Sequence, residues 1–379
     1  MSAWRLVKLG EVLRHRKQFI TIDDLTMYKR ARVQLHAKGI VLRDEVPGGL
    51  IKTKSQQVCR AAEFLVAEID AKVGGFGLVP DALDGAIVSS HYFLFEIDTT
   101  HLDRRFLDYF ARTPTFREQV AAQGTTNYAA IRPSDVLSYE IPLPALPDQQ
   151  RLVARIDAIV ADVIAAKDLH DQVNAEADQL CRALLHGDPD AQPTPLRDLV
   201  SLRPPDVSVQ ADETYQFAGV YCFGRGVFVG ERKTGLDFSY SKLTRLRPGN
   251  FVYPKLMAWE GAFGIVPPEC GGLVVSTEFP VFELRADKVM PEVLDTYFRD
   301  PLLWPQIAGT SIGTNVRRRR LNPQQFLDHR IPLPSIATQV RLQKVSAEID
   351  ALKAAQAASR AELDALLPAI LDRAFAGAL

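Results

Sequence analysis

Two long stretches of the chain carry apolar residues at the spacing of helices that pack along one face. In residues 342–370 the steps alternate between three and four residues, at Leu342, Val345, Ile349, Leu352, Gln356, Ser359, Leu363, Leu366 and Ile370. This is a heptad seam with a polar middle. Residues 148–185 carry a second seam, at Leu152, Ile156, Ile159, Val163, Ala166, Leu169, Val173, Ala177, Leu180 and Leu184. Neither helix can bury its stripe alone, so we predict that the two pack as an antiparallel coiled coil.

Outside these stretches the pattern changes to the apolar–polar alternation of short strands, and it occurs twice. Residues 75–97 and 262–284 align without a gap, 187 positions apart. Within these segments Phe76 matches Phe263 and Gly77 matches Gly264. The same offset continues upstream, where it matches Tyr28 with Tyr215, Val33 with Val220 and Phe64 with Phe251. A repeat of this length indicates a duplicated domain, because solenoid units are only about 20–50 residues long.

Each copy ends in Ile-Pro-Leu-Pro, at residues 141–144 and 331–334. Alternating prolines exclude a helix and predict an extended segment that leads rigidly out of the globular unit. Residues 186–195, HGDPDAQPTP, follow the first long helix and are predicted to be a linker.

These patterns predict an α+β protein with two homologous mixed α/β domains and two long helices. We place the domains at 1–147 and 188–337 and the helices at 148–187 and 338–379. We expect an approximate twofold axis, with the domains at opposite ends of the helix pair.

Composition limits where the protein is expected to act and what kind of molecule it is expected to bind. The net charge is −1, so any positive charge that meets a nucleic acid must be local. No apolar run reaches the about 20 residues of a membrane helix, and the N-terminus lacks the apolar core of a signal peptide. Four cysteines without paired spacing predict reduced thiols and a cytoplasmic location.

Common catalytic motifs are absent from the sequence. There is no HExxH, no GxSxG and no P-loop. The glycine-rich segments at residues 74–77 and 224–226 lack the strand–GxGxxG–helix context of a nucleotide site, and residues 322–324 are not the NPP-aromatic motif of adenine methyltransferases. We expect no catalytic residue, metal site or cofactor in this chain.

The candidate binding residues are basic, polar and aromatic residues in loops that share a frame between the copies. The four arginines at 317–320 correspond to the segment 128–132, which reads Tyr-Ala-Ala-Ile-Arg. Such a run is usually a solvated loop, but its place beside the exit of the domain and opposite the segment in the first copy favours a binding role. Two domains that read different DNA sequences need loops with a shared frame and different side chains. The candidates are Lys52, Lys54, Arg60, Lys72, Asn127, Tyr128 and Arg132 in the first copy, and Lys242, Arg245, Lys255, Trp259, Asn315, Arg317, Arg318, Arg319 and Arg320 in the second.

With these features the chain resembles the DNA-specificity subunit of type I restriction–modification systems. The resemblance rests on the tandem repeat, the opening from Trp4 to Val12, the GxVP and VSS or VST segments, and the segment Ile141–Leu152, IPLPALPDQQRL. Residues 331–342, IPLPSIATQVRL, match more loosely, with Thr338 where Asp148 stands in the first copy.

The resemblance implies a non-catalytic role in host defence and DNA methylation. Each globular unit would be a target-recognition domain that reads one half of a bipartite site in double-stranded DNA. The paired helices would set the spacer and dock two adenine-N6 methyltransferase subunits, and restriction (motor–nuclease) subunits would join them. S-adenosylmethionine, ATP and magnesium would belong to those partners. Since the loops differ between the copies, the site should be asymmetric.

Two other classes remain open at this point. One is a non-catalytic coiled-coil scaffold whose domains bind protein. The other is a stand-alone DNA methyltransferase or nuclease, which the missing motifs argue against and which binding of S-adenosylmethionine by the isolated chain would support.

Overall fold

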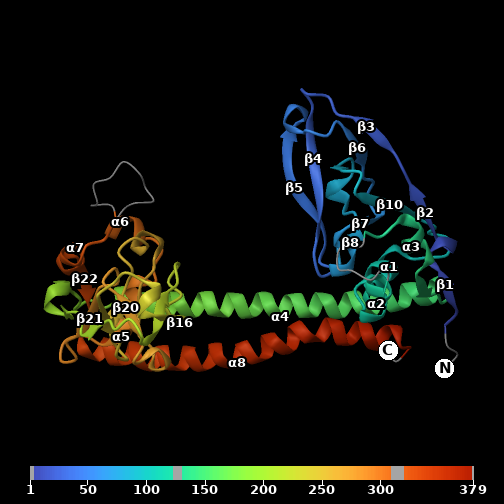
Figure 1. The fold of residues 1–379 in the computed structure, drawn as a ribbon. Coiled ribbons are helices and arrows are strands. Elements are labelled where there is room, and N and C mark those ends of the chain that lie inside the picture. The colour runs from blue at the N-terminus through green and yellow to red at the C-terminus, as the bar shows by residue number, and fades with distance from the viewer. Residues whose placement is uncertain (1–3, 123–129, 309–319, 378–379) are drawn as a thin grey trace. The chain divides into compact units, whose positions relative to one another are not determined.

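The same set of sheets is built twice along the chain. The computed structural model describes residues 4–122, 130–308 and 320–377, which belong to two units, Met1–Asp168 with Ser359–Leu379 and Leu169–Ala358. Each long helix contributes one segment to each unit, so a unit is a mixed α/β body with two helix segments (Figure 1).

Among the described residues of unit 1 there are three sheets. Their strand orders are β2-β10-β7-β8, β3-β6-β9-β4-β5 and β1-β11. The strands are β1 (Leu6–Lys8), β2 (Leu13–Arg16), β3 (Phe19–Thr21), β4 (Met27–Gln34), β5 (Gly39–Pro47), β6 (Ser55–Val58), β7 (Phe64–Ala67), β8 (Phe76–Leu78), β9 (Ile87–Val88), β10 (Tyr92–Ile97) and β11 (Glu140–Pro142).

Unit 2 repeats this arrangement strand for strand. The orders are β13-β21-β18-β19, β14-β17-β20-β15-β16 and β12-β22. The strands are β12 (Gln192–Pro195), β13 (Val200–Leu202), β14 (Val207–Ser208), β15 (Thr214–Val220), β16 (Val227–Thr234), β17 (Lys242–Arg245), β18 (Phe251–Val252), β19 (Gly264–Ile265), β20 (Val274–Ser276), β21 (Val281–Leu284) and β22 (Arg330–Leu333).

The helices are repeated in the same way. Unit 1 has α1 (Arg104–Ala111), α2 (Pro114–Ala122) and α3 (Pro133–Ser138), with 3-10 turns η1 (Leu9–Glu11), η2 (Gly48–Leu50), η3 (Asp70–Val73) and η4 (Asp81–Leu83). Unit 2 has α5 (Pro291–Phe298), α6 (Trp304–Ala308) and α7 (Pro323–Asp328), with η5 (Leu196–Asp198), η6 (Gly235–Asp237), η7 (Ala258–Glu260) and η8 (Pro268–Cys270). Both α3 and α7 begin with a proline, which suits the first turn because no backbone donor is needed there.

The match between the units extends to irregular details. In each unit one strand pair is parallel, β4 with β9 and β15 with β20, while the other described pairs are antiparallel. Each long hairpin also has a register shift at the same place, between Arg30 and Ala31 and between Gln216 and Ala218. The predicted duplication of a mixed α/β domain is therefore confirmed.

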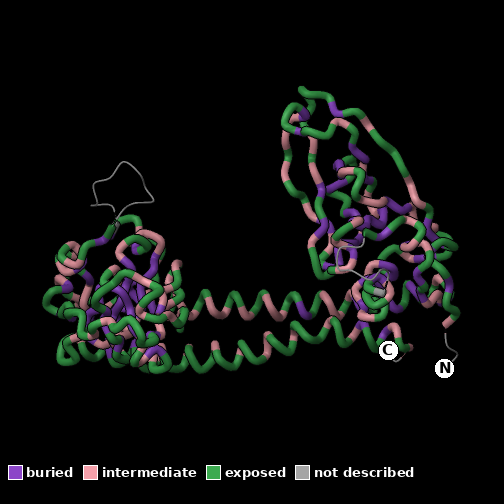
Figure 2. Tube along the Cα trace, in the orientation of Figure 1, coloured by how far each residue is buried: buried purple, intermediate pink, exposed green. Residues whose placement is uncertain are grey.

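Aromatic side chains fill the core of each body. In unit 1 the rings of Phe64 and Phe116 pack on Phe76, with centroids 6.2 and 5.2 Å away. In unit 2 the ring of Phe326 packs on Phe251, the counterpart of Phe64, with the centroids 5.3 Å apart. Figure 2 shows the buried residues gathered inside the bodies, while most residues along the middle of the long helices are exposed or intermediate.

The long helices are α4 (Leu146–His186), of 41 residues, and α8 (Ile336–Phe375), of 40 residues. In unit 1 the Lys167 side chain of α4 forms an ion pair with Asp364 of α8. In unit 2 the Lys353 amine of α8 lies 2.8 Å from Asp178 Oδ1 of α4. The hydrophobic cores agree, since Leu152 near the start of α4 packs in one cluster with Leu371 near the end of α8, and Leu185 near the end of α4 packs in another with Leu342 near the start of α8. The two helices therefore run antiparallel, which confirms the antiparallel coiled coil.

The predicted seam of α4 is displaced by one residue at two positions, while Leu152, Ile156 and Val163 are buried as predicted. Leu169 and Leu180 are 57% and 49% exposed, although the heptad pattern placed them at the interface. The residues that follow them, His170 and Cys181, are the less exposed ones. The inner row of α4 is therefore more polar than its leucines indicate.

The same displacement occurs in α8, where Leu352 is 42% exposed and Lys353 is more enclosed. The cores of the bodies explain it. Leu185 and Leu342 are fully buried in the unit 2 core, which fixes how the ends of both helices face. Each helix is continuous, so the orientation of its end also sets the orientation of its middle. It therefore decides whether the predicted leucines or the residues that follow them face the partner helix.

In each unit the first strand pairs with the last. Strand β1 pairs with β11 and β12 pairs with β22, so the predicted extended Ile-Pro-Leu-Pro segments are strands. Prolines are tolerated there because each strand of a two-stranded sheet has a free edge. The prediction that all of residues 186–195 form a linker is wrong, since Gln192–Pro195 is β12. Its pairing partner lies far along the sequence, beyond the reach of a local pattern.

A buried glutamine holds the start of each long helix against its body. Gln149 is fully buried; its Nε2 donates to the carbonyl oxygens of His101 and Pro144 at 2.8 and 2.9 Å, and its Oε1 accepts from the backbone N–H of Asp103 at 2.8 Å. Two of these hydrogen bonds join the helix to the loop before α1, and the third holds the proline segment that leads into the helix.

Gln339 makes the same three hydrogen bonds at the start of α8. Its Nε2 donates to the carbonyls of Lys288 and Pro334, and its Oε1 accepts from the backbone N–H of Met290 at 2.9 Å. We call Gln149 and Gln339 the glutamine clamps.

Candidate nucleic-acid interface

Four loops that are distant in sequence meet in unit 1. They are the β4–β5 turn (35–38), the segment around η3 (68–75), the β9–β10 turn (89–91) and the residues before α3 (130–132). Backbone hydrogen bonds join them: His36 N–H to the Val73 carbonyl at 2.7 Å, Ile131 N–H to the Glu68 carbonyl at 3.1 Å, and Glu68 N–H to the His91 carbonyl at 2.8 Å. We call this group the loop cluster of unit 1.

The loop cluster of unit 2 is built in the same way, from residues 221–226, 255–262, 276–279 and 320–322. The N–H of Phe223 donates to the Glu260 carbonyl at 2.7 Å, and the N–H of Leu321 donates to the Lys255 carbonyl at 2.9 Å. The N–H of Lys255 donates in turn to the Glu278 carbonyl at 3.0 Å. Both units therefore share one loop frame that carries different side chains.

Charge in the unit 2 cluster is concentrated around one carboxylate. Arg320 Nη2 lies 2.5 Å and Lys255 Nζ 3.8 Å from the oxygens of Glu278, and Lys255 Nζ also donates to the Thr277 carbonyl at 2.8 Å. Two cations around one anion leave a local positive charge, and the exposed Arg320 can exchange Glu278 for a phosphate.

A protonated thiol supports the same cluster. Cys222 Sγ donates to Glu260 Oε2 at 3.2 Å, which joins the β15–β16 turn to η7. Burial, together with the nearby Glu260 carboxylate, raises the pKa of Cys222 to about 11, so the thiol keeps its proton at neutral pH.

In unit 1 the corresponding contact is between His91 and Glu68, with Nδ1 and Oε2 2.6 Å apart. Lys72 lies in η3 and Arg132 precedes α3, where it is exposed. The two clusters thus differ in charge on a shared loop frame, because unit 2 has Lys255 where unit 1 has Glu68.

The structure brings several of the predicted DNA-contacting residues together. Lys72 and Arg132 lie in the cluster of unit 1, and Lys255, Trp259 and Arg320 lie in that of unit 2. Lys242 borders it, in a shallow pocket that Thr277 also lines. The predicted residues Asn127, Tyr128, Asn315, Arg317, Arg318 and Arg319 lie outside the described residues.

Other predicted residues lie away from the clusters and make contacts within the protein. Lys54 Nζ lies 2.5 Å from Asp24 Oδ1, and Lys52 lies in the same loop before β6. Arg245, at the end of β17 away from Lys242, donates to the carbonyl of Gly272 at 2.9 Å.

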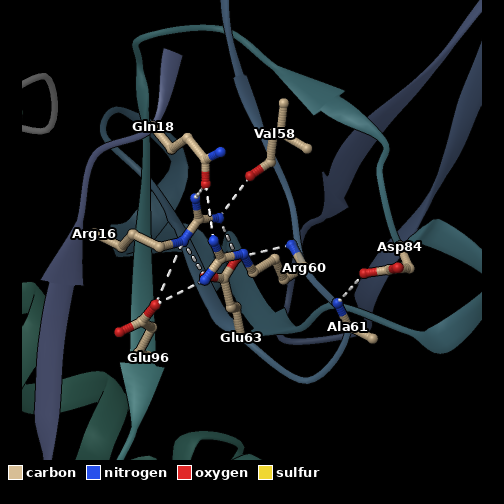
Figure 3. A network of polar contacts seen from close by, with 8 residues as sticks. All are labelled: Arg16, Gln18, Val58, Arg60, Ala61, Glu63, Asp84 and Glu96. Atoms are coloured by element: carbon tan, nitrogen blue, oxygen red, sulfur yellow. Dashed lines mark hydrogen bonds and ion pairs between the residues drawn. The ribbon is translucent and has the colours of Figure 1, made fainter. Parts of the chain in front are cut away.

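Arg60 belongs to a polar network in unit 1 (Figure 3). Its guanidinium lies 3.0 Å from Glu96 Oε1 and 3.0 Å from Gln18 Oε1. Beside it, the buried Arg16 forms a two-point ion pair with Glu63 and donates to the Val58 carbonyl at 2.6 Å (Figure 3). Arg60, which follows β6 of the five-stranded sheet, therefore links that sheet to β10 of the four-stranded sheet.

Exposed residues of the hairpin turns complete each cluster and were missed by the sequence reading. They are His36 and Lys38 in unit 1, and Phe223 and Arg225 in unit 2. The glycine-rich segments at 74–77 and 224–226 could have pointed to these residues, because each segment lies where a hairpin turn contacts the neighbouring loop of its cluster.

Within the described ranges, no group of three or more His, Cys, Asp or Glu residues is placed to hold a metal ion. Of the helices that the structure describes, none combines the length and the apolar character needed to cross a membrane.

The architecture defines a class of protein in which a duplicated α/β body is carried on an antiparallel pair of long helices, and solved structures share it. One is a chain from the structure described as the structural basis underlying complex assembly and conformational transition of the type I R-M system. It has a TM-score of 0.66 and 22% identity, over 100% of this chain and 99% of that chain. The HsdS subunit from Thermoanaerobacter tengcongensis has a TM-score of 0.51 and 23% identity, over 100% of this chain and 98% of that chain.

No family model matches the sequence, and no curated protein matches it. The likeness to these structures spans the whole chain and, at these identities, shows the fold. This chain has the fold of the HsdS subunit, which confirms the resemblance drawn from its repeat and its long helices.

Proposed function

We propose that this chain is the DNA-specificity subunit of a type I restriction–modification complex. One observation carries the proposal: two bodies with the same backbone, down to the hydrogen bonds of their loop clusters, carry different side chains on those loops. A shared frame with different side chains suits two readers of different half-sites, so the full site is bipartite and asymmetric.

The chain itself holds and positions DNA, and the chemistry belongs to its partners. Two adenine-N6 methyltransferase subunits dock on it and use S-adenosylmethionine to methylate a flipped adenine in each half-site. Restriction (motor–nuclease) subunits, which use ATP and magnesium, join that core. The paired helices set the distance between the half-sites.

The test is methylation mapping of DNA from cells that express the chain with its methyltransferase subunit. Lys255→Ala with Arg320→Ala should abolish methylation or relax the bases accepted in one half-site only. Lys72→Ala with Arg132→Ala should act on the other half-site. Each pair removes cations from one loop cluster and is the control for the other.

The same reasoning applies to Arg317→Ala with Arg318→Ala, which should also affect a single half-site. An equal loss over both half-sites in every variant would contradict separate readers. Binding of S-adenosylmethionine by the chain alone would support a stand-alone methyltransferase in place of the proposal.

A further inference from the structure

The tips of the two long hairpins are held in the same unusual way. His36 and Ala37 have φ of 62° and 55°, and their counterparts Phe223 and Gly224 have φ of 64° and 65°. The N–H of His36 and that of Phe223 each donate to the loop cluster, and so do those of the residues that follow them. Left-handed backbone is unfavourable for His, Ala and Phe, so the surrounding structure holds these tips in shape.

The glycine-rich segments supply the close support. A Cβ on Gly74 would lie 2.5 Å from the backbone nitrogen of Ala37, and a Cβ on Gly77 would lie 3.1 Å from the Cα of Gly39. In unit 2 a Cβ on Gly264 would lie 2.9 Å from Val227 Cγ2. Glycine suits these positions because the hairpin end approaches the segment closely, and at Gly74, which also has φ of 80°, a side chain would clash with backbone.

Each supported tip exposes one ring and one cation. Phe223 is 63% exposed, although its ring lies 6.2 Å from that of Trp304. The Arg225 guanidinium lies 4.8 Å from the ring of Tyr221, itself 43% exposed. No carboxylate among the described residues forms an ion pair with Arg225, so this cation is available to a ligand.

Unit 1 places His36 and Lys38 at the same two positions, and both are exposed. Strands β5 and β16 are the edge strands of their sheets, so each hairpin is a two-stranded ribbon at a sheet edge. A two-stranded ribbon is one of the two shapes that the DNA major groove admits.

We propose, resting on the proposed function, that the hairpin tips enter the major groove and contact base edges. Phe223 and Arg225 do so in the half-site read by unit 2, and His36 and Lys38 do so in the other. An aromatic ring suits the thymine methyl group, and a guanidinium suits guanine O6 and N7. The fixed tip holds both side chains in place before DNA binds, which lowers the ordering cost of binding.

The decisive variant is Phe223→Gly in the complex of the full chain with its methyltransferase subunit. Glycine favours φ near 64°, so the backbone is kept while the ring is removed. We expect the methylation rate at the native site to fall about tenfold. Mapped methylation should tolerate more bases in the unit 2 half-site only, and His36→Gly should do the same for unit 1.

Ala62→Gly is the matched control. Ala62 has φ of 63° in a turn before β7, and its counterpart in unit 2 is already a glycine, Gly249, with φ of 81°. This change relieves the same backbone strain and removes no tip side chain, so the site and the rate should stay unchanged.

A DNA probe tests the ring contact directly. Replacing the thymines of the unit 2 half-site with uracil removes their methyl groups. This should slow methylation by the unchanged complex and have no further effect on the Phe223→Gly complex. Additive losses would overturn the methyl contact.

The outcomes separate the two proposals. If the unchanged complex methylates no bipartite site, the proposed function fails and the tip contact fails with it. If it methylates such a site and both glycine variants keep site and rate, the tip proposal is overturned while the function stands. Where thermal denaturation shows that Phe223→Gly lowers stability, Phe223→Asn, which also tolerates this backbone, gives the same test.

Discussion

A buried arginine stands at the same place in both units and takes different partners. Arg16 in unit 1 pairs with Glu63, and the two side chains are only 9% and 5% exposed. Arg203 in unit 2 donates to Asn250 Oδ1 and Asp206 Oδ2, both at 2.8 Å. Since Asn250 is the counterpart of Glu63, the charge that neutralises the arginine has moved to another residue. A buried guanidinium needs such a carboxylate, but several positions can supply it.

Glu63→Ala should lower the free energy of unfolding of unit 1 by about 3–5 kcal/mol, because it leaves the enclosed Arg16 with only the more distant Glu96 carboxylate, 4.0 Å away, to compensate its charge. Glu96→Ala removes a carboxylate that is 43% exposed, lies 3.0 Å from Arg60 and only 4.0 Å from Arg16, and should cost less than about 1 kcal/mol. Amide hydrogen exchange measures both effects in unit 1. Equal losses for the two variants would contradict a special role for the buried pair.

At the level of elements, the glutamine clamps stabilise the attachment of each long helix to its globular body. Gln149→Leu keeps the size of the side chain but removes its three hydrogen bonds to backbone groups, one of them buried and two partly buried. We expect it to destabilise unit 1 by at least about 2 kcal/mol. Gln150→Leu, at the exposed neighbouring position, is the control and should be nearly neutral. Hydrogen exchange at α1 would show whether the loss begins at this junction.

The start of α8 depends on a carboxylate and therefore on pH. Hydrogen bonds from the Thr338 hydroxyl, the Asp190 backbone and Ser335 hold the pKa of Asp188 at about 2, below its ordinary value of 3.8. Because the pKa is lowered by folding, the stabilisation is complete above about pH 4 and is lost as the pH falls towards 2. Thermal denaturation of the protein and of Asp188→Asn should differ at pH 7 and converge near pH 2. A constant difference would contradict this account.

At the scale of the whole molecule, the helix pair should determine spacing. Deleting residues 168–174 of α4 and 357–363 of α8 removes one heptad from each helix and keeps Lys167 opposite Asp364 and Asp178 opposite Lys353. Seven residues of helix span about 10 Å, so we expect the preferred spacer to shorten by about 3 base pairs while the half-site sequences stay the same.

Deleting only residues 168–174 is the control, because it puts the two helices out of register and should abolish methylation. Mapped methylation that keeps the original spacer after the matched deletion would rule out the helices as the determinant of spacing.

Much of the architecture could be predicted because it follows from patterns within short segments of the sequence. The alternation around Val33 and the repeat that links Phe64 to Phe251 are properties of short segments, and so are the ends of the long helices. The helix seam could not be chosen correctly, since Leu180 and Cys181 both fit a heptad and only the distant core around Leu185 and Leu342 decides between them.

The candidate site could be predicted only in part. Basic residues such as Lys54 and Arg60 look available in a sequence, but their acidic partners come from segments that are about 30 residues or more away along the chain. The hairpin tips were missed for a related reason. The residue types of His36 and Phe223 do not predict left-handed backbone, and it is the packing of another loop that holds them in this conformation. What the sequence did show was the glycines on which that packing depends.

The pairing of β1 with β11 and of β12 with β22 brings the two ends of each body side by side. A segment whose ends meet can be cut out and replaced as a cassette without disturbing the helices that carry it. Such a layout lets evolution or an engineer obtain a new combination of binding surfaces by trading whole bodies between chains, instead of accumulating single substitutions within one of them.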